Sequence, residues 1–226
     1  MRSMSTVQTD FDRIALVSPE GATHNEHYHN FLLRHLPPHP ANVLEIGCGK
    51  GHFSRLLAKR SERVLAIDLS PEMIRSAREL SQSFTNIDYE LADVMTYDLP
   101  PAGFDCIASI ATLHHLPLRE VILKMKAALK PGGVLLILDL FAARGLLDAV
   151  ANPLAMAVSV SMRLIHQHRL LPPRAVRAAW AAHGEHDIYP TIADVHDLCA
   201  EILPGAKIKK HLLWRYSIIW QKGSER

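Results

Sequence analysis

Two acidic residues, Glu45 and Asp68, each stand at the end of a short apolar run. In the stretch VLEIGCGKGHF (residues 43–53), the first acid is followed by three glycines at alternate positions. Glycine lets the backbone approach a ligand closely and adopt positive φ at little cost. A carboxylate beside such a loop attracts a cation, and the second carboxylate can accept both hydroxyls of a ribose. These residues indicate a site for a nucleoside with a positively charged tail.

A nicotinamide dinucleotide is the competing ligand for a glycine-rich loop of this kind. Dinucleotide sites carry G-x-G-x-x-G and direct a helix N-terminus at the pyrophosphate. Here the spacing is G-x-G-x-G, and His52 stands where the third glycine should be. The carboxylate of Glu45 would also repel phosphate. The loop therefore favours the cationic nucleoside and ranks a nicotinamide dehydrogenase last.

The elements that position these residues follow from the hydrophobic pattern. From residue 42 onward, short apolar runs alternate with helical patterns, which predicts βαβ units and a mostly parallel sheet. The run VLLILDL is apolar at successive positions, as a sheet covered on both faces requires. We expect strands at Val43–Ile46, Arg63–Asp68, Ile87–Leu91, Phe104–Ile110 and Val134–Leu140, a turn at residues 131–133, and helices at Phe53–Lys59, Pro71–Leu80 (after an N-cap at Ser70) and Leu118–Leu129.

The end of the chain predicts a different connection. Lys207–Leu213 and Tyr216–Lys222 are strand-like runs with almost no linker, so only an antiparallel hairpin fits them. A crossover helix should precede them at Thr191–Leu203, with Thr191 as its N-cap and Asp194 three residues on. The expected fold is α/β: a doubly wound, seven-stranded, mostly parallel sheet with a C-terminal antiparallel hairpin.

A length of 226 residues predicts one domain. Within it we expect an N-terminal helical cap (1–40), a cofactor-binding core (41–140), a helical lid insertion (141–190) and a C-terminal helix with the hairpin (191–226).

Five blocks of the chain, in order, resemble the motifs of class I S-adenosylmethionine-dependent methyltransferases. They are VLEIGCGKGHFSRLLA, RVLAIDLSPEMIRSAR, LADV, FDCIASIATLHHL and LKPGGVLLILDL, and they span residues 42–140. All five together are far more specific than the glycine loop alone. The resemblance implies a Rossmann-like methyltransferase fold, S-adenosylmethionine as cofactor and S-adenosylhomocysteine as product.

Carried over by position, the resemblance also implies roles for single residues. Glu45 and the backbone of the glycine loop hold the methionine part, and Asp68 binds the ribose hydroxyls. Asp93 accepts from the adenine amino group, while Val94 donates its backbone N–H. Tyr28, in the N-terminal cap, is a further expected contact. The complete predicted cofactor site comprises Tyr28, Glu45, Gly47, Cys48, Gly49, Gly51, Asp68, Leu69, Met73, Asp93, Val94, Ile110 and Ala111.

His114 and His115, in ATLHHLP, are the candidate catalytic residues. They follow the fourth strand, where the resemblance places the reactive methyl group. A hydroxyl acceptor benefits from a base, and histidine serves best near neutral pH. Capping or packing is the alternative role for the pair. Methyl transfer requires no metal, and HGEHD at residues 183–187 lacks the spacing of a helical HExxH pair, so we expect no metal site.

The insertion should determine which acceptor binds. LAMAVSVSMRLI and AVRAAWAA are apolar and helical, with Met156, Met162 and Trp180 as adaptable lining, which favours a lid over an apolar small-molecule pocket. Packing on the sheet or on a second subunit is the alternative. Arg215 lies either in an aromatic edge over the core or against an acidic acceptor.

Composition and charge limit the partners. The net charge of +2, with 48% hydrophobic and 21% charged residues, is ordinary for a soluble globular protein. No [DNS]-P-P-[YFW] follows the fourth strand and no basic run carries interleaved aromatics, so we expect no nucleic-acid partner. Three cysteines without a CxxC pair, no apolar leader and no membrane span predict a cytoplasmic location. The oligomeric state stays open between monomer and dimer.

The sequence therefore predicts an enzyme that methylates a small, partly apolar metabolite. Two alternatives remain: a non-catalytic S-adenosylmethionine-binding protein, and a methyltransferase acting on protein or RNA. A closed, substrate-sized pocket at the methyl group would favour the first, a filled pocket the second, and an open charged face the third.

Overall fold

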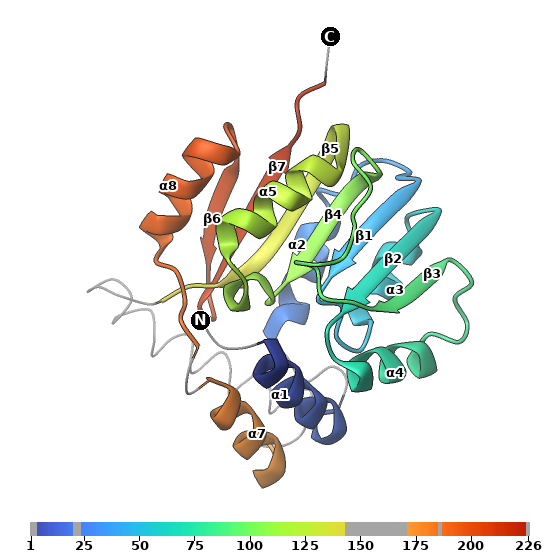
Figure 1. The fold of residues 1–226 in the computed structure, drawn as a ribbon, viewed down its shortest axis with the longest axis vertical. Helices are drawn as coiled ribbons and strands as arrows, with labels where there is room; N and C mark the ends of the chain where they lie inside the picture. Colours follow the sequence, from blue (N-terminus) through green and yellow to red (C-terminus); the bar gives the residue numbers. More distant parts are fainter. Residues whose placement is uncertain (1–3, 20–23, 143–170, 185–186, 225–226) are drawn as a thin grey trace.

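The computed structural model describes residues 4–19, 24–142, 171–184 and 187–224. They form a seven-stranded sheet in the order β3-β2-β1-β4-β5-β7-β6, with helices on both faces (Figure 1). The first five strands are parallel, and β7 runs antiparallel to both β5 and β6. This confirms the predicted fold class, including the C-terminal hairpin. The strands are β1 Asn42–Ile46, β2 Arg63–Asp68, β3 Ile87–Leu91, β4 Phe104–Ile110, β5 Leu129–Leu140, β6 Lys207–His211 and β7 Arg215–Gln221.

One strand begins earlier than its apolar pattern indicates. β5 starts at Leu129, so the expected turn at residues 131–133 lies within it. The β4–β5 register shifts between Phe104 and Cys106, which marks a bulge at that point. The Pro-Gly-Gly segment is held against the end of β7, because Gly132 N–H donates to Lys222 O and Lys222 N–H donates to Gly133 O. Pairing with a distant strand therefore overrides the local turn signal.

Alternate residues of the central strands feed two separate cores. Leu135 and Ile137 of β5 pack with α5 (Leu118–Ala128) and α8 (Ile192–Ile202). Leu136 and Leu138 point to the other face, toward α2 (His29–Leu33), α3 (His52–Ala58) and α4 (Pro71–Leu80). Burial on both faces explains the unbroken apolar runs. The three cysteines are free and buried.

Helix starts follow the capping residues in the sequence. Ser70 accepts a hydrogen bond from Met73 N–H at 3.1 Å, and Pro71 occupies the first turn of α4. Thr191 and Asp194 form a reciprocal capping box at the start of α8. Both predicted N-caps are confirmed.

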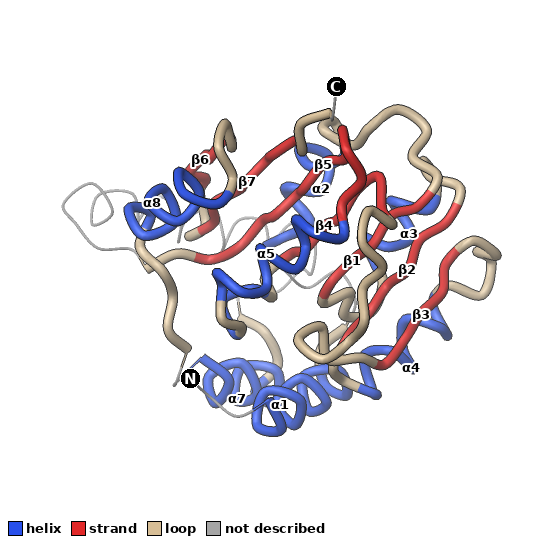
Figure 2. Tube along the Cα trace, turned by 45° about the horizontal axis from the view of Figure 1, so that its top comes forward, coloured by secondary structure: helices blue, strands red, loops and turns tan. Residues whose placement is uncertain are grey.

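Two helices cover the carboxyl ends of the parallel strands. α1 (Met4–Val17) and α7 (Arg174–Gly184) lie side by side below the sheet in Figures 1 and 2, and α1 also packs on α4. Their shared cluster, Ile14, Ala15, Met73 and Ala179, is separate from both sheet cores. Two short 3₁₀ turns, η1 (His24–Tyr28) and η2 (Leu113–His115), complete this end. The division of the chain into cap, core, lid and C-terminal parts stays a prediction.

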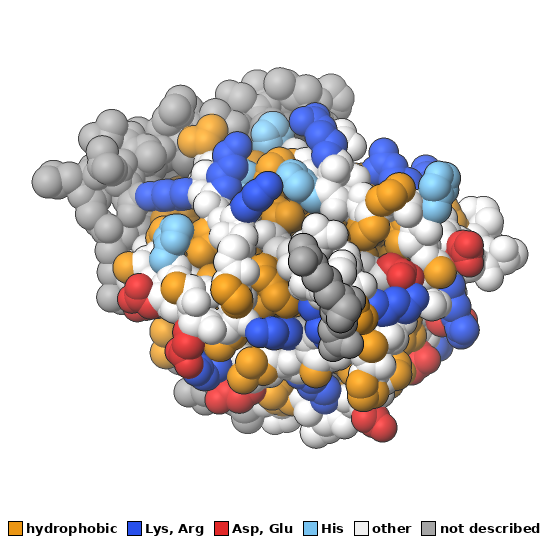
Figure 3. All heavy atoms as spheres, turned by 90° about the horizontal axis from the view of Figure 1, so that it is seen from above, with side chains coloured by type: hydrophobic (Ala, Val, Ile, Leu, Met, Phe, Trp, Pro, Cys, Tyr) orange, Lys and Arg blue, Asp and Glu red, His pale blue; other side chains and the backbone are white. Residues whose placement is uncertain are grey.

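Figure 3 shows the opposite end of the molecule, where side chains of both charges are interspersed with apolar ones. Among the described helices, none is both long and apolar enough to cross a membrane.

Candidate active site

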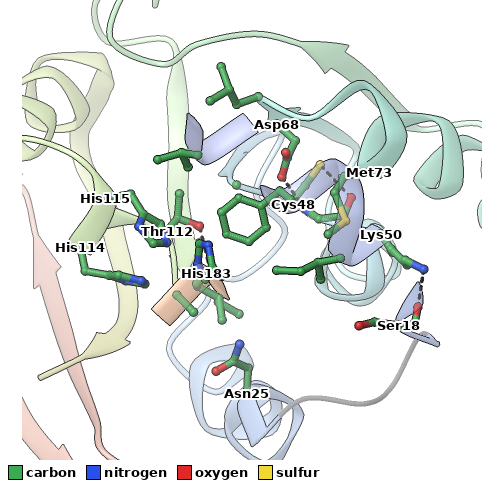
Figure 4. A pocket seen from close by; sticks show the side chains of 18 of the residues that line it. Ser18, Asn25, Cys48, Lys50, Asp68, Met73, Thr112, His114, His115 and His183 are labelled. Carbon is green, nitrogen blue, oxygen red and sulfur yellow. Dashed lines mark hydrogen bonds between the residues drawn. The ribbon is translucent and has the colours of Figure 1, made fainter. Parts of the chain in front are cut away.

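A cavity of about 740 Å³ lies between the carboxyl ends of the parallel strands and the covering helices α1 and α7. Ile46, Asp68, Ile110 and Leu140, at the ends of β1, β2, β4 and β5, form its floor. Ligands of doubly wound sheets bind at this edge. Figure 4 shows polar side chains that reach the cavity from several segments far apart in the sequence.

The glycine loop curves around one end of the cavity. Gly47 and Gly49 have φ of 74° and 53°, in the region that favours glycine. The N–H groups of Gly47 and Cys48 donate to Ile67 O, which fixes the loop on β2. A Cβ at Gly47 would collide with Thr112, whereas one at Gly49 would meet no atom within 4 Å. The loop is thus packed tightly at Gly47 against the turn that follows β4, and it leaves free space beside Gly49.

Asp68 ties together the two loops that flank the predicted cofactor site. Its Oδ2 accepts from Gly49 N–H at 2.8 Å, and its Oδ1 accepts from Ser70 N–H at 2.9 Å. Burial raises the pKa of this carboxyl, while the backbone hydrogen bonds oppose the rise. Each oxygen can accept further hydrogen bonds, so the carboxylate suits a pair of ribose hydroxyls.

Glu45 is 2% exposed at the end of β1. Ser54 Oγ donates to its Oε2 at 2.5 Å. Burial raises the pKa of Glu45 to about 8; the hydrogen bond from Ser54 lowers it and the nearby charge of Asp68 raises it. A buried carboxyl that is costly to ionise gains most from a cation placed beside it. The positively charged methionine end of the cofactor fits that requirement.

The predicted adenine side is formed by Asp93 and Val94, which line the cavity next to Ala92. Asp93 Oδ1 accepts from Met95 N–H at 2.9 Å, which orients the carboxyl after β3. Val94 is buried within the core on the α5 side.

Two contacts that the sequence does not predict fasten α1 over the glycine loop and the loop after β2. Lys50, in the glycine loop, donates from Nζ to Ala15 O at 2.7 Å and to Ser18 O at 2.6 Å, and Figure 4 shows the contact with Ser18. Asp12 Oδ1 accepts from Ser70 Oγ at 2.5 Å. The helix is therefore bonded to the loops that follow both β1 and β2.

The other end of the cavity carries a buried histidine–aspartate pair. His114 Nδ1 lies 2.6 Å from Asp139 Oδ1, and their side chains are 4% and 1% exposed. Asp139 also accepts from the backbone N–H of His114 at 2.9 Å and of Leu140 at 2.8 Å. Asp139 lies one residue before the end of the apolar run VLLILDL, much as Glu45 and Asp68 lie at the ends of theirs, so the sequence could have shown it.

His115, His183 and Asp187 adjoin this pair. Asp187 Oδ1 lies 3.5 Å from His115 Nδ1, and its Oδ2 lies 3.5 Å from His183 Nε2. The rings of His114 and His115 have centroids 3.8 Å apart. Figure 4 shows His115 and His183 approaching each other from different segments. The stretch 183–187 thus contributes His183, Gly184 and Asp187 to the cavity wall.

Arg215, at the start of β7, also lines this end. Its Nε donates to Asn25 Oδ1 and its Nη1 to Leu213 O, both at 2.8 Å. Burial lowers the pKa of the guanidinium, although the charge of Asp139 opposes this. Arg215 thus lines the cavity at the end that holds His114 and His115, and its contact with an acidic acceptor stays a prediction.

Most predicted site residues come together, and two do not. Tyr28 is not among the lining residues: its hydroxyl donates to Leu212 O at 2.7 Å and its ring contacts His211. Gly51 is the N-cap of α3 and is not among the lining residues; a Cβ there would collide with Tyr89. Met156 and Met162 lie outside the described residues. The predicted residues that do line the cavity are Glu45, Gly47, Cys48, Gly49, Asp68, Leu69, Met73, Asp93, Val94, Ile110, Ala111, His114, His115 and Trp180.

Comparison with known proteins identifies the family. Residues 43–133 match the family described as a methyltransferase domain. A methyltransferase of Mycobacterium tuberculosis, described as uncharacterized, is 30% identical over 203 residues, which cover 87% of this chain and 95% of that protein. The chain belongs to the class I S-adenosylmethionine-dependent methyltransferases. A ubiquinone biosynthesis O-methyltransferase of Xylella fastidiosa is 32% identical over 160 residues, covering 69% of this chain and 64% of that protein.

Solved structures agree in fold. The N-methyltransferase NodS of Bradyrhizobium japonicum, in complex with S-adenosylhomocysteine, superposes with a TM-score of 0.63 at 18% identity, over 95% of this chain and 97% of that one. The [4+2]-cyclase SpnF superposes with a TM-score of 0.65 at 14% identity, over 99% and 98% of the chains. The predicted cofactor, S-adenosylmethionine, and the predicted enzyme class are thereby confirmed. The cyclase shows that the fold by itself does not fix the reaction.

Proposed function

We propose that this methyltransferase acts on a small, partly apolar acceptor that binds beside His114 and His115. The observation that carries the proposal is a single cavity joining Glu45 and Asp68 at one end to the two histidines at the other. Its volume of about 740 Å³ lies within the range of small-molecule sites. The name of the Xylella relative, a ubiquinone biosynthesis O-methyltransferase, supports an acceptor of this kind.

The walls between the two ends are largely apolar. Val7, Phe11 and Ile14 of α1 and Val176 and Trp180 of α7 line the cavity opposite the strand ends. An apolar acceptor body gains free energy by leaving water against these side chains, at roughly 25 cal/mol per Å² of buried apolar surface. The covering helices also exclude water from the reacting atoms.

The cofactor supplies an electrophilic methyl group. The chain must bind the acceptor in line with the bond between sulfur and the methyl carbon, and it must take up the proton that the acceptor loses. Asp139 accepts the Nδ1 proton of His114 in the tautomer that this pairing favours, which leaves the lone pair on Nε2. That lone pair activates the acceptor, with Asp139 fixing the ring and its tautomer.

The proposal is tested with radiolabelled S-adenosylmethionine and a panel of phenols, hydroxy acids and amines. For an acceptor that is methylated, His114→Ala should lower kcat by about 100-fold, the usual contribution of an acid–base group. S-adenosylhomocysteine affinity should stay within about twofold. The matched control is His196→Ala, because His196 lies exposed on α8, outside the cavity lining.

Labelling of bulk protein or RNA, with none of the small acceptors, would contradict a small-molecule acceptor. Full activity of His114→Ala would remove the activating role of this side chain and leave the acceptor class standing.

A further inference from the structure

The cavity wall gathers histidine and aspartate side chains from separate parts of the chain. One ligand atom each of His114, His115 and Asp187 lies within 4.8 Å of the other two, within the described part of the chain. The two histidines belong to η2, after β4, whereas Asp187 follows α7. Their side chains are 4%, 5% and 2% exposed. All three line the cavity at the acceptor end.

His114 has the surroundings of a metal-binding histidine. Such residues bind the ion with one ring nitrogen and donate from the other to a carboxylate or carbonyl, which fixes the ring. Here Asp139 Oδ1 lies 2.6 Å from Nδ1 of His114, and Asp139 is fully buried. The backbone N–H of His114 donates to the same carboxylate, so ring and turn are held together. Nε2 remains as the ligand atom.

The distance between Asp187 and His115 fits two ligands that share one ion. The two oxygens of Asp187 lie 3.5 Å from His115 Nδ1 and 3.5 Å from His183 Nε2. Both separations exceed the usual 2.7–3.2 Å of an N–H···O hydrogen bond. Ligand atoms about 2.1 Å from a tetrahedral zinc ion stand about 3.4 Å apart. The ligand atoms of His114, His115 and Asp187 all lie within 4.8 Å of one another, so binding of an ion would draw them closer together.

Charge points the same way. Three carboxylates, Asp10, Asp139 and Asp187, contact imidazoles in this cluster, and the latter two are nearly inaccessible to water. Buried carboxylates are costly unless positive charge is close. If the imidazoles are neutral, Arg215 is the cation whose charge acts on Asp139. Among the described residues, no ion pair joins a carboxylate to the guanidinium of Arg215. A divalent ion among the imidazoles would add positive charge beside these carboxylates.

We propose that His114, His115 and Asp187 bind a divalent transition-metal ion of the zinc type. Two imidazoles and one carboxylate suit zinc, manganese, iron or cobalt, whereas magnesium and calcium prefer oxygen ligands throughout. Three protein ligands leave coordination positions directed at the cavity, as catalytic metal sites require. His183 lies 3.5 Å from both Asp187 and Asp10 and adjoins the carboxylate without being counted as a ligand.

The role of the ion rests on the proposed function. A hydroxyl acceptor bound at the open position would be more acidic, so its O–H bond would break and the proton would pass to the water molecule that the acceptor displaces from the ion. The oxygen then forms a bond to the methyl carbon as the carbon–sulfur bond breaks, and S-adenosylhomocysteine leaves. No oxidant or reductant is needed. The lone pair of His114 thus acts through the ion.

Metal binding is measured first, without cofactor or acceptor. The full-length, tag-free protein is treated with EDTA, dialysed and titrated calorimetrically with ZnCl₂, and in parallel with CoCl₂ while the visible absorption is recorded. We expect one ion per chain at micromolar affinity or better, with a cobalt spectrum of nitrogen and oxygen ligation. Asp187→Asn and His115→Gln should each weaken binding by at least about 100-fold, as the loss of one ligand from a three-ligand site requires. His196→Gln, an exposed histidine on α8, should bind like the parent protein.

Thermal unfolding and S-adenosylhomocysteine affinity of each variant verify that it is folded. Absence of saturable one-to-one binding, or equal affinity of the parent and both variants, would overturn the site. Tight binding of MgCl₂ with none of ZnCl₂ would overturn the transition-metal assignment.

Activity assays distinguish failure of the proposed metal site from failure of the proposed function. Zinc binding that depends on Asp187, without methylation of any small acceptor, would keep the site and overturn the proposed function. Undiminished turnover by the metal-free protein would overturn the catalytic role of the ion and leave the proposed function intact.

Discussion

Both carboxylate oxygens of Asp68 accept hydrogen bonds from the protein itself. They fix Gly49 and Ser70, so this side chain shapes the loops on both sides of the predicted ribose position. Asp68→Ala should therefore remove the acceptor for the ribose hydroxyls and loosen the glycine loop together. Two lost hydrogen bonds of about 1–1.5 kcal/mol each predict a fall in S-adenosylhomocysteine affinity of at least about 10-fold.

Calorimetric titration measures this fall. Asp88→Ala is the matched control, because Asp88 is an exposed acid on β3 that pairs with Arg63. An unchanged dissociation constant for Asp68→Ala would show that this carboxylate does not contribute to the cofactor site.

Glu45 makes cofactor binding depend on pH. Burial raises its pKa to about 8, so the carboxyl of the free protein is mostly protonated at pH 7. A positively charged cofactor favours the ionised form, so binding should release a proton. Affinity should then rise with pH and level off near pH 8. The same shift makes the free protein less stable as pH rises from about 4.5, the ordinary value, through about 8.

Proton release is measured at pH 7 by calorimetry in two buffers of different ionisation enthalpy. The amino group of S-adenosylmethionine itself titrates near pH 8, so Glu45→Gln supplies the reference. The parent protein should release more protons than the variant. Equal release by both would mean that Glu45 does not change its ionisation on binding.

Among single residues, the sequence predicts those whose place in the site follows from their position at the end of a strand. Glu45 and Asp68 end apolar runs, and parallel strands bring those ends to one edge. Tyr28 was expected at the cofactor site but does not line the cavity. Which face of the short turn η1 points toward the cavity depends on tertiary packing, and local sequence does not encode it. The Tyr28 hydroxyl reaches Leu212, 184 positions away in the chain. The approach of Asp187 to His115 has the same origin, and no local spacing encodes it.

Among the elements, α1 is held in place partly by hydrogen bonds from Lys50, which lies in the glycine loop and not in the helix. Lys50 bonds two carbonyls at the helix's C-terminal end, where a cation also meets the negative end of the helix dipole. Lys50→Met should speed hydrogen exchange of α1 amides by up to about 5-fold, the equivalent of about 1 kcal/mol for a partly exposed contact.

Mass spectrometry of exchanged peptides resolves this change. Lys59→Met, an exposed lysine after α3, should leave α1 unaltered. Exchange of α1 at the parent rate in Lys50→Met would show that apolar packing alone fastens the helix.

Elements also show where local signals fail. Capping residues predicted the starts of α4 and α8 correctly, because a cap is a contact between near neighbours. The start of β5 was missed, because Gly132 and Gly133 pair with Lys222 across the sheet. Turn chemistry is a local preference, and a neighbouring strand that supplies hydrogen bonds can override it.

Over the whole molecule, the sheet and its cover are stabilised by different contacts. The two large cores lie between the sheet and the helices on its faces, and α1 contributes only Met4, at the edge of one of them. Its other apolar contacts form the small cluster with Met73 and Ala179. The fold should therefore survive without α1, whereas the cavity loses one wall.

A chain that begins at residue 24 tests this separation. Circular dichroism should show one cooperative unfolding transition, with the midpoint lowered by about 2–4 °C for each kcal/mol of stability lost. Its affinity for S-adenosylhomocysteine should fall by at least about 10-fold, because Phe11 and Ile14 no longer bury apolar surface of the ligand. Parent-like affinity would show that the cofactor binds the strand ends without α1. Loss of cooperative unfolding would show that the helix is part of the folding unit, because a cover that only encloses the ligand cannot carry the stability of the sheet.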